Sequence, residues 1–217
     1  MATINRGILD GFFGKVGTVV GSFWKGIPVM RAYVRRIRDR KNSPQLLIRA
    51  RFATLGELSS AFLAATRIGM RNAAAKSRTT ESNVFVNKNW SAVEADSVDS
   101  VTVDFASLVV AHGPLTGVQF GSPQFDTPQQ VDVSFDTNEE IDKTSLDDLV
   151  YLFAYCPDAK CGVLSPAVKR SDKSVSVTVP AYWNGMKVHL WGFTLGDGLD
   201  NKGMLSNSVY IGSGNIG

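Results

Sequence analysis

Histidine and cysteine are scarce in this chain of 217 residues. It contains two of each, and they are His112, His189, Cys156 and Cys161. Their spacing matches none of the usual zinc-ligand patterns, and no nucleophile or acid-base motif accompanies either histidine. We therefore expect no metal, no cofactor and no small-molecule substrate. The chain is not expected to be an enzyme.

The two cysteines enclose a short segment, residues 157–160, after a strand-like stretch. A disulfide closing this loop is geometrically possible. Without an export signal, two reduced thiols are the favoured interpretation. The spacing does not match a CxxC redox motif.

Long apolar runs are also missing. The longest, residues 16–24, lies between Lys15 and Lys25 and falls well short of the roughly 20 residues that cross a bilayer. Asp10 and Lys15 interrupt the region where a secretion signal needs an apolar core. We expect no membrane span. We place the protein in the cytoplasm where it is made, or in a virion if a phage encodes it.

Sequence motifs for catalysis are lacking as well. Gly14-Lys15 is not a phosphate loop, because Leu9 and Val16 stand where that motif needs Gly and Ser or Thr. Two acidic pairs occur, Glu139-Glu140 and Asp147-Asp148. Adjacent acids in a polar connection are usually solvated, although Asp148 could also begin the following strand.

Acidic residues are scarce in the first part of the chain. Residues 1–88 hold sixteen Lys and Arg against four Asp and Glu, a net charge of +12. Residues 89–217 hold seven against sixteen, a net charge of −9. The total of +3 therefore combines two oppositely charged parts.

Glycine, in contrast, is frequent near the N-terminus. Gly7, Gly11, Gly14, Gly17 and Gly21 recur every three or four residues, and Trp24 follows. In a helix this spacing would form one glycine stripe, but so many glycines make an isolated helix poor. We favour an extended or looped arm that is ordered by packing through these six residues.

A helix is predicted next. Asn42-Ser43-Pro44 is typical of a helix start, and the pattern stays helical until about Lys76. One apolar stripe comprises Ile48, Phe52, Leu55, Phe62 and Thr66, with Leu58 beside it, while Arg49, Arg51, Arg67 and Arg71 lie around the rest. Gly56 and Gly69 each mark a bend or a close contact.

From about residue 100 the apolar period becomes two, which predicts strands. The expected strands are residues 101–105, 108–111, 117–120, 130–136, 149–155, 174–179, 188–193 and 208–211. The fold class is α+β, with an N-terminal arm and amphipathic helix followed by an antiparallel immunoglobulin- or fibronectin-like β-sandwich. The expected domains are residues 1–88 and 89–217.

Several sequence pieces resemble a domain-of-unknown-function family abundant in Bacteroidota. They are Gly14-Lys15-Val16-Gly17, Trp24-Lys25-Gly26 with Arg31, Gln45 with Arg49 and Phe52, Ile68-Gly69-Met70, Asp148-Leu149-Val150-Tyr151, and residues 206–212. The resemblance runs end to end. It implies a helical N-terminal part, a C-terminal β-sandwich and no established activity. The basic run at residues 35–41 is denser than this family's usual shorter, Pro-containing connection.

The basic segment is the strongest functional feature of the sequence. It comprises Arg31, Arg35, Arg36, Arg38, Arg40, Lys41, Arg49 and Arg51. Its partner could be an acidic protein surface, such as the second part of a neighbouring copy. It could also be nucleic acid, with stacking on Tyr33, Phe23 and Trp24, or the segment could simply be solvated.

We predict a non-enzymatic structural or interaction protein, most plausibly a self-assembling or virion-type component. In this interpretation the basic arm docks on neighbouring subunits in a homo-oligomer or on other structural proteins. The alternative is a nucleic-acid-binding module that uses the same segment.

Overall fold

The chain forms two compact units, residues 1–45 and 46–217, here called the N-terminal unit and the body. The structure is a computed structural model, and it describes residues 2–3, 13–36, 42–138 and 143–217. The boundary lies far from the expected 88/89, because the helices before residue 89 share a hydrophobic core with the sheets that follow.

The N-terminal unit is an antiparallel sheet in the order β1-β4-β3-β2. Its strands are β1 (Ala2–Thr3), β2 (Gly14–Val16), β3 (Val19–Trp24) and β4 (Ile27–Ala32). Lys25 and Gly26 join β3 to β4 with φ angles of 46° and 78°, as a two-residue hairpin turn of type I′ requires. The expected extended arm is thus paired with itself. The helical N-terminal part implied by the family resemblance does not include residues 14–32.

Four helices open the body: α1 (Ser43–Ala61), α2 (Leu63–Gly69), α3 (Arg71–Lys76) and α4 (Glu81–Lys88). The helix start expected at residues 42–44 is confirmed. The expected single helix is interrupted at Phe62 and Met70, and α4 was not expected. Thr80 caps α4, since its Oγ1 accepts a hydrogen bond from the Asn83 amide at 3.3 Å.

Three antiparallel sheets follow, in the orders β10-β9-β13-β14 with β11 also on β9, β12-β8-β7, and β5-β6. The strands are β5 (Val93–Ala95), β6 (Val101–Val103), β7 (Gln119–Gln124), β8 (Gln130–Asp136), β9 (Leu149–Cys156), β10 (Cys161–Leu164), β11 (Val168–Lys169), β12 (Ser174–Thr178), β13 (Lys187–Leu195) and β14 (Val209–Asn215). Short 3-10 turns lie at η1 (Trp90–Ala92), η2 (Phe105–Ser107), η3 (Arg170–Asp172) and η4 (Ala181–Trp183).

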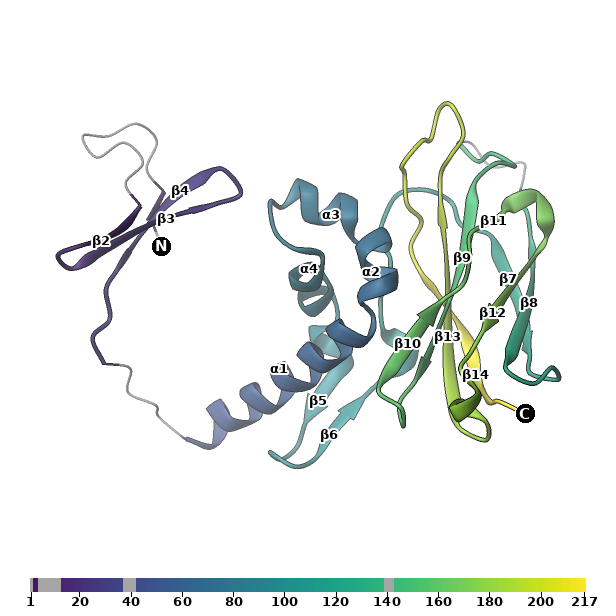
Figure 1. Cartoon of the computed structure of the whole chain (residues 1–217), viewed down its shortest axis with the longest axis horizontal. Helices are drawn as coiled ribbons and strands as arrows, with labels where there is room; N and C mark the ends of the chain where they lie inside the picture. The colour runs from purple at the N-terminus through teal and green to yellow at the C-terminus, as the bar shows by residue number, and fades with distance from the viewer. Residues whose placement is uncertain (1, 4–12, 37–41, 139–142) are drawn as a thin grey trace. The chain divides into compact units, whose positions relative to one another are not determined.

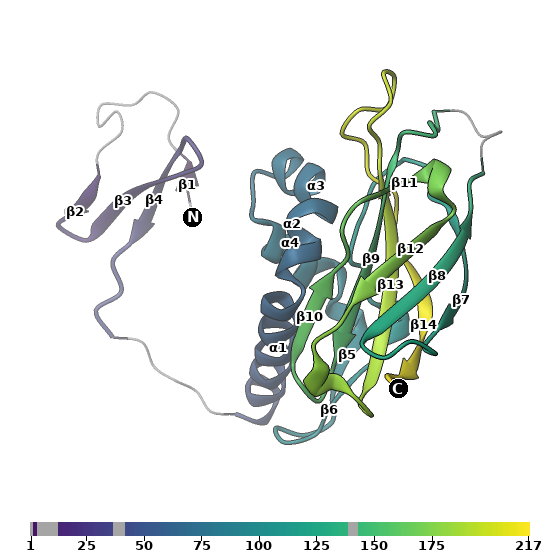
Figure 2. The ribbon, with the colours of Figure 1, turned by 45° about the vertical axis from the view of Figure 1, so that its right-hand side comes forward.

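The body has three layers, with the helices on one face of the β9–β13 sheet and the β12-β8-β7 sheet on the other (Figures 1 and 2). Phe153 and Trp191 of the central sheet pack with Phe62 on the helical side. Leu152 and Leu190 pack with the outer sheet instead. Because successive side chains of a strand alternate between faces, β9 and β13 are buried on both. The α+β class is therefore confirmed.

One expected strand is wrong. Residues 108–111 form no strand, although Leu108, Val110 and Ala111 are buried. Side chains satisfy the middle of this segment, while the Ala111 carbonyl accepts from the Ser208 backbone amide at 3.0 Å. The side-chain amide of Asn89 accepts a hydrogen bond from the Val109 N–H at 2.7 Å and donates one to the Val109 carbonyl at 2.9 Å. Ser208 Oγ accepts a hydrogen bond from the Val110 N–H at 2.8 Å. An apolar run can thus be buried as irregular chain.

The apolar stripe predicted along α1 is only half correct. Leu55, Leu58, Phe62 and Thr66 are buried. Ile48 and Phe52 are 56% and 57% exposed, because every buried residue of α1 lies in its C-terminal half. The N-terminal half of this helix therefore carries apolar side chains that the body does not cover.

Candidate binding surfaces

One face of the N-terminal sheet is made entirely of apolar side chains and glycine. The strand register places Val16, Val19 and Ala32 in one row, Gly14, Gly21 and Met30 in the next, and Phe23 opposite Pro28. We call these residues the apolar sheet face. Val16 is 62% and Phe23 49% exposed, and Gly21 is the only buried residue of 13–36. The described residues of this unit therefore form no hydrophobic core of their own.

The opposite face carries cations and aromatic rings. Lys15, Val20 and Arg31 form one row, and Trp24 lies opposite Ile27. The Lys15 Nζ lies 3.7 Å from the centroid of the Tyr33 ring, a cation–π contact. Residues 1–45 hold nine Lys and Arg against two Asp and Glu, a net charge of +7.

The residues expected to make contacts fall into three groups. Arg31, Arg35 and Arg36 are exposed on the N-terminal unit. Gly14 and Gly17 have φ angles of 105° and 58° at the ends of β2, so their spacing reflects turn geometry rather than a helical stripe. The positions outside the described residues are Gly7, Gly11, Arg38, Arg40 and Lys41.

Arg49 and Arg51 lie on α1 of the body, and Arg51 already has an internal role. Its guanidinium lies 4.4 Å from the centroid of the Trp90 ring and donates a hydrogen bond to the Trp90 carbonyl. This contact joins α1 to η1. Phe52, Val86 and Trp90 line an open cavity of about 670 Å³ beside it. We call this cavity, together with Ile48, the α1 groove.

The charge division runs through the body. Residues 46–92, the helical layer with η1, hold seven Lys and Arg against two Asp and Glu, while residues 93–217 hold seven against sixteen. Three acids, Glu94, Asp96 and Asp99, are exposed on the β5–β6 hairpin, which follows η1 along the chain. Figures 1 and 2 both show this hairpin beside α1.

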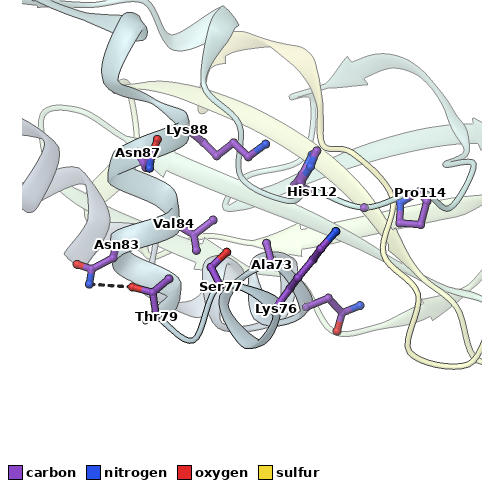
Figure 3. A pocket seen from close by; sticks show the side chains of 12 residues that line it. Ala73, Lys76, Ser77, Thr79, Asn83, Val84, Asn87, Lys88, His112 and Pro114 are labelled. Atoms are coloured by element: carbon purple, nitrogen blue, oxygen red, sulfur yellow. Dashed lines mark hydrogen bonds between the residues drawn. The ribbon is translucent and has the colours of Figure 1, made fainter. Parts of the chain in front are cut away.

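A second cavity, of about 910 Å³, is lined by α3, α4 and residues 112–114 (Figure 3). Lys76, Lys88 and His112 border it together with Asn83, Asn87 and Ser77, and no described Asp or Glu lines it. We call it the polar pocket. His112 Nδ1 lies 2.9 Å from Asn207 Oδ1, which also accepts a hydrogen bond from the Gly113 amide. Because an amide oxygen only accepts, His112 carries its proton on Nδ1 here.

One ion pair of the body is buried and connects several loops. Arg170 and Asp148 form an ion pair of 3.2 Å, and both side chains are fully buried. Arg170 also donates to the carbonyls of Thr137 and Thr116, and Asn201 donates to Asp148 at 2.7 Å. Burial lowers the pKa of Arg170, and the neighbouring carboxylate opposes this effect. The expectation of two solvated acids thus holds for exposed Asp147 but is wrong for Asp148.

The second histidine is packed among aromatic rings. His189 stacks on Phe105 with ring centroids 4.3 Å apart, and its Nδ1 lies 2.9 Å from the Tyr210 hydroxyl. Burial lowers the pKa of His189, and Lys187 lowers it further. Burial also raises the pKa of nearby Tyr155 to about 12. These groups favour the neutral state, which is typical of core packing.

The two cysteines lie opposite each other in the β9–β10 register, and both are free thiols. The Cys156 thiol contacts Met186 Sδ at 3.7 Å, whereas the Cys161 thiol lies 3.4 Å from the Tyr182 hydroxyl. In the described part of the chain, no three His, Cys, Asp or Glu side chains gather as a metal site would need. No described helix is long and apolar enough to cross a membrane.

Sequence reasoning did not find the polar pocket. Its residues come from three separate segments, and no motif links Lys76, Lys88 and His112. The only sequence feature that pointed to this region is the family-like piece at residues 206–212. Its Asn207 side chain forms hydrogen bonds with His112 and Gly113 at the edge of the pocket. Ser206 has a similar role, since its Oγ accepts from the Thr194 amide at 2.8 Å.

These features define an α+β protein whose body combines a basic helical layer with acidic sheets, and whose N-terminal unit is a basic sheet with one apolar face. The chain belongs to a family of unknown function, DUF6266, whose model matches residues 11–212. The family membership expected from the sequence pieces is thereby confirmed. A search of curated proteins finds no significant match.

Proposed function

We propose that this protein is a structural or interaction protein that assembles with copies of itself. In this proposal the N-terminal unit of one copy docks on the body of another. A virion-type component, in the virion or in the cytoplasm, is the finer form of the proposal, as is an immunoglobulin- or fibronectin-like description of the sandwich. The observation that carries the proposal is the apolar sheet face, which the described residues of its own unit leave partly exposed.

A sheet is stable in water when its apolar face packs against another layer. The apolar sheet face exposes Val16 and Phe23, and residues 13–36 bury only Gly21. Burying apolar surface yields about 25 cal/mol per Å². A partner that covers this face would therefore gain binding free energy and would supply the missing core.

Charge complementarity selects the occupant. The N-terminal unit has a net charge of +7, so a partner surface with an acidic rim fits it best. The α1 groove offers apolar Ile48 and Phe52, both more than half exposed. The exposed acids of the β5–β6 hairpin lie beside this helix (Figures 1 and 2). The groove and hairpin of a second copy thus match an apolar, basic sheet.

The test is the mass of the full-length protein by size-exclusion chromatography with light scattering, over a range of concentrations. We expect an oligomer that dissociates in high salt, because salt screens the charge pairs. Phe23→Ser on one side and Phe52→Ser on the other should each produce monomer. The matched control is Tyr182→Ser, an exposed aromatic residue on η4, which should leave the mass unchanged.

Two outcomes would overturn assembly through the apolar sheet face and the α1 groove. One is a wild-type chain that stays monomeric at the highest concentration in low salt. The other is an oligomer that persists unchanged in both the Phe23 and the Phe52 variants. Neutralising the hairpin with Glu94→Gln, Asp96→Asn and Asp99→Asn separates the electrostatic contribution to assembly from the apolar one. This variant should weaken assembly only in low salt.

Nucleic-acid binding is the second candidate, and one observation favours it. Arg31, Arg35 and Arg36 are exposed on the unit that also presents half-exposed Trp24 and Tyr33. Guanidinium groups bind phosphates, and aromatic rings stack on bases. Fluorescence anisotropy with labelled single- and double-stranded probes should show affinity that falls with salt, and Arg35→Ala with Arg36→Ala should reduce the salt dependence. Absence of binding in low salt removes this candidate.

A further inference from the structure

We propose that the polar pocket binds a small phosphorylated molecule, such as a nucleotide or a sugar phosphate. The pocket lies wholly within the body (Figure 3). The inference does not rest on self-assembly, although the polar pocket and the α1 groove share Asn83 and Asn87 of α4. It also departs from the sequence-based expectation of no small-molecule ligand.

The electrostatics of the pocket favour an anion. Lys76 at the end of α3 and Lys88 at the end of α4 both line it, and neither makes an ion pair with any described residue. Figure 3 shows both lysines and His112 around the same opening. Without a carboxylate among the described lining residues, these cations remain available to a ligand. A lysine ammonium binds phosphate as a point charge.

Neutral polar groups beside the cations suit the rest of such a ligand. The Asn87 amide and the Ser77 hydroxyl line the pocket and have no hydrogen-bond partner among the described residues. An amide both donates and accepts, so it can bond sugar hydroxyls or the edge of a base. Ala73, Val84 and Pro114 provide apolar surface. This mixture of apolar walls and a few polar groups is typical of small-molecule sites.

The size of the pocket agrees with a ligand larger than a single ion. Its volume of about 910 Å³ lies within the range of roughly 300–1,000 Å³ found for small-molecule sites. His112 is held on one edge, because Asn207 fixes its Nδ1–H. Its Nε2 is therefore the ring atom left for a ligand, as an acceptor when neutral and as a donor when protonated.

Isothermal titration calorimetry on the full-length protein tests the proposal with four probes: inorganic phosphate, pyrophosphate, ATP and glucose 6-phosphate. We expect at least one organic phosphate to bind more tightly than inorganic phosphate. Tighter binding of ATP identifies a nucleotide, and tighter binding of glucose 6-phosphate identifies a sugar phosphate. Adenosine and glucose, which lack the phosphate, should not bind.

Variants locate the binding. Lys76→Ala with Lys88→Ala should weaken it at least about tenfold, because it removes both lysine ammonium groups that line the pocket. Arg67→Ala with Lys187→Ala is the control, since it removes two exposed cations that do not line the pocket. Asn87→Leu keeps the charge and removes the amide that would bond the sugar or base, so it should weaken binding of the organic phosphate while pyrophosphate binding persists.

The proposal is overturned if no probe binds at millimolar concentration, or if the Lys76 and Lys88 variant binds as the control does. Equal weakening in both double variants would also overturn it, because this result indicates general attraction to a basic layer. Urea unfolding of each variant checks that the body remains folded. A failure of self-assembly would leave these expectations unchanged.

Discussion

Antiparallel strands occur in both units of this protein, yet among the described residues only those of the body form a hydrophobic core. In the body, the central strands β9 and β13 are covered by helices on one face and by a second sheet on the other. In the N-terminal unit, residues 13–36 bury one glycine. The strands of both units are rich in apolar residues. A stable layer therefore depends on its cover as much as on its own sequence.

Charge separates the two units as well. The N-terminal unit is basic, whereas the body combines a basic helical layer with acidic sheets. The body also contains a fully buried ion pair, held by several loops. We expect the stability of the chain to reside in the body alone.

The largest effect is expected from the buried ion pair. Asp148→Asn leaves the Arg170 guanidinium buried without its counter-charge and should lower the free energy of unfolding by about 3–5 kcal/mol. Urea unfolding followed by circular dichroism measures this change. The adjacent Asp147 is the matched control, because its pair with Lys169 is exposed, and Asp147→Asn should leave the midpoint unchanged. Equal midpoints for both variants would contradict the structural role of Asp148.

Two glycines on the helices provide a smaller contrast. A Cβ on Gly69 would lie 2.6 Å from the Ala111 Cβ and 2.7 Å from the Val110 carbonyl oxygen, whereas a Cβ on Gly56 meets nothing within 4 Å. Gly69→Ala should destabilise the body by about 1–3 kcal/mol. Gly56→Ala should stabilise it by up to about 1 kcal/mol. The midpoints of thermal unfolding of the two variants test this contrast. Midpoints that shift in the same direction would contradict the close contact between Gly69 and residues 110 and 111.

His189 should make stability depend on pH. Its pKa is lowered in the folded body by burial and by Lys187, so the unfolded chain takes up the proton first as the pH falls below about 6.5. The contribution of neutral His189 to the free energy of unfolding is present in full above that pH, and it is lost as the pH falls to the lowered pKa of the folded body. His189→Gln should have a flatter pH profile of urea midpoints than the wild type. Parallel profiles would show that His189 does not contribute.

The smallest effect is expected from removing the N-terminal unit. Residues 43–217 retain every buried residue of both core clusters, so their midpoint of thermal unfolding should equal that of the full chain measured as monomer. Calorimetry of the two chains makes the comparison. A marked loss of stability on truncation would mean that the N-terminal unit contributes to the core of the body.

Several elements followed directly from sequence. Residues 130–136 and 174–179 alternate because β8 and β12 bury only one face, and the observed strands agree closely with them. The start of α1 at Ser43 was equally clear, because Pro44 fits only the first turn of a helix. These features depend on neighbours within a few residues along the chain.

Other features could not be read from the sequence. Residues 108–111 look like a strand, but side chains of Asn89 and Ser208 satisfy the middle of this segment. Ile48 and Phe52 continue the apolar stripe of α1, yet no layer of the body covers them. The polar pocket joins Lys76, Lys88 and His112 from separate segments. In each case the outcome depends on which distant segments of the chain pack against the residue.

By itself, the sequence determined the local periods, the helix start and the change of charge near residue 88, because each depends on residue types at close spacing. Tertiary structure decided what that change of charge separates. It divides two layers that share one core, rather than two domains, and the compact units meet at residues 45 and 46 instead. The physical reason is that burial depends on contacts between distant segments, whereas charge and periodicity accumulate residue by residue.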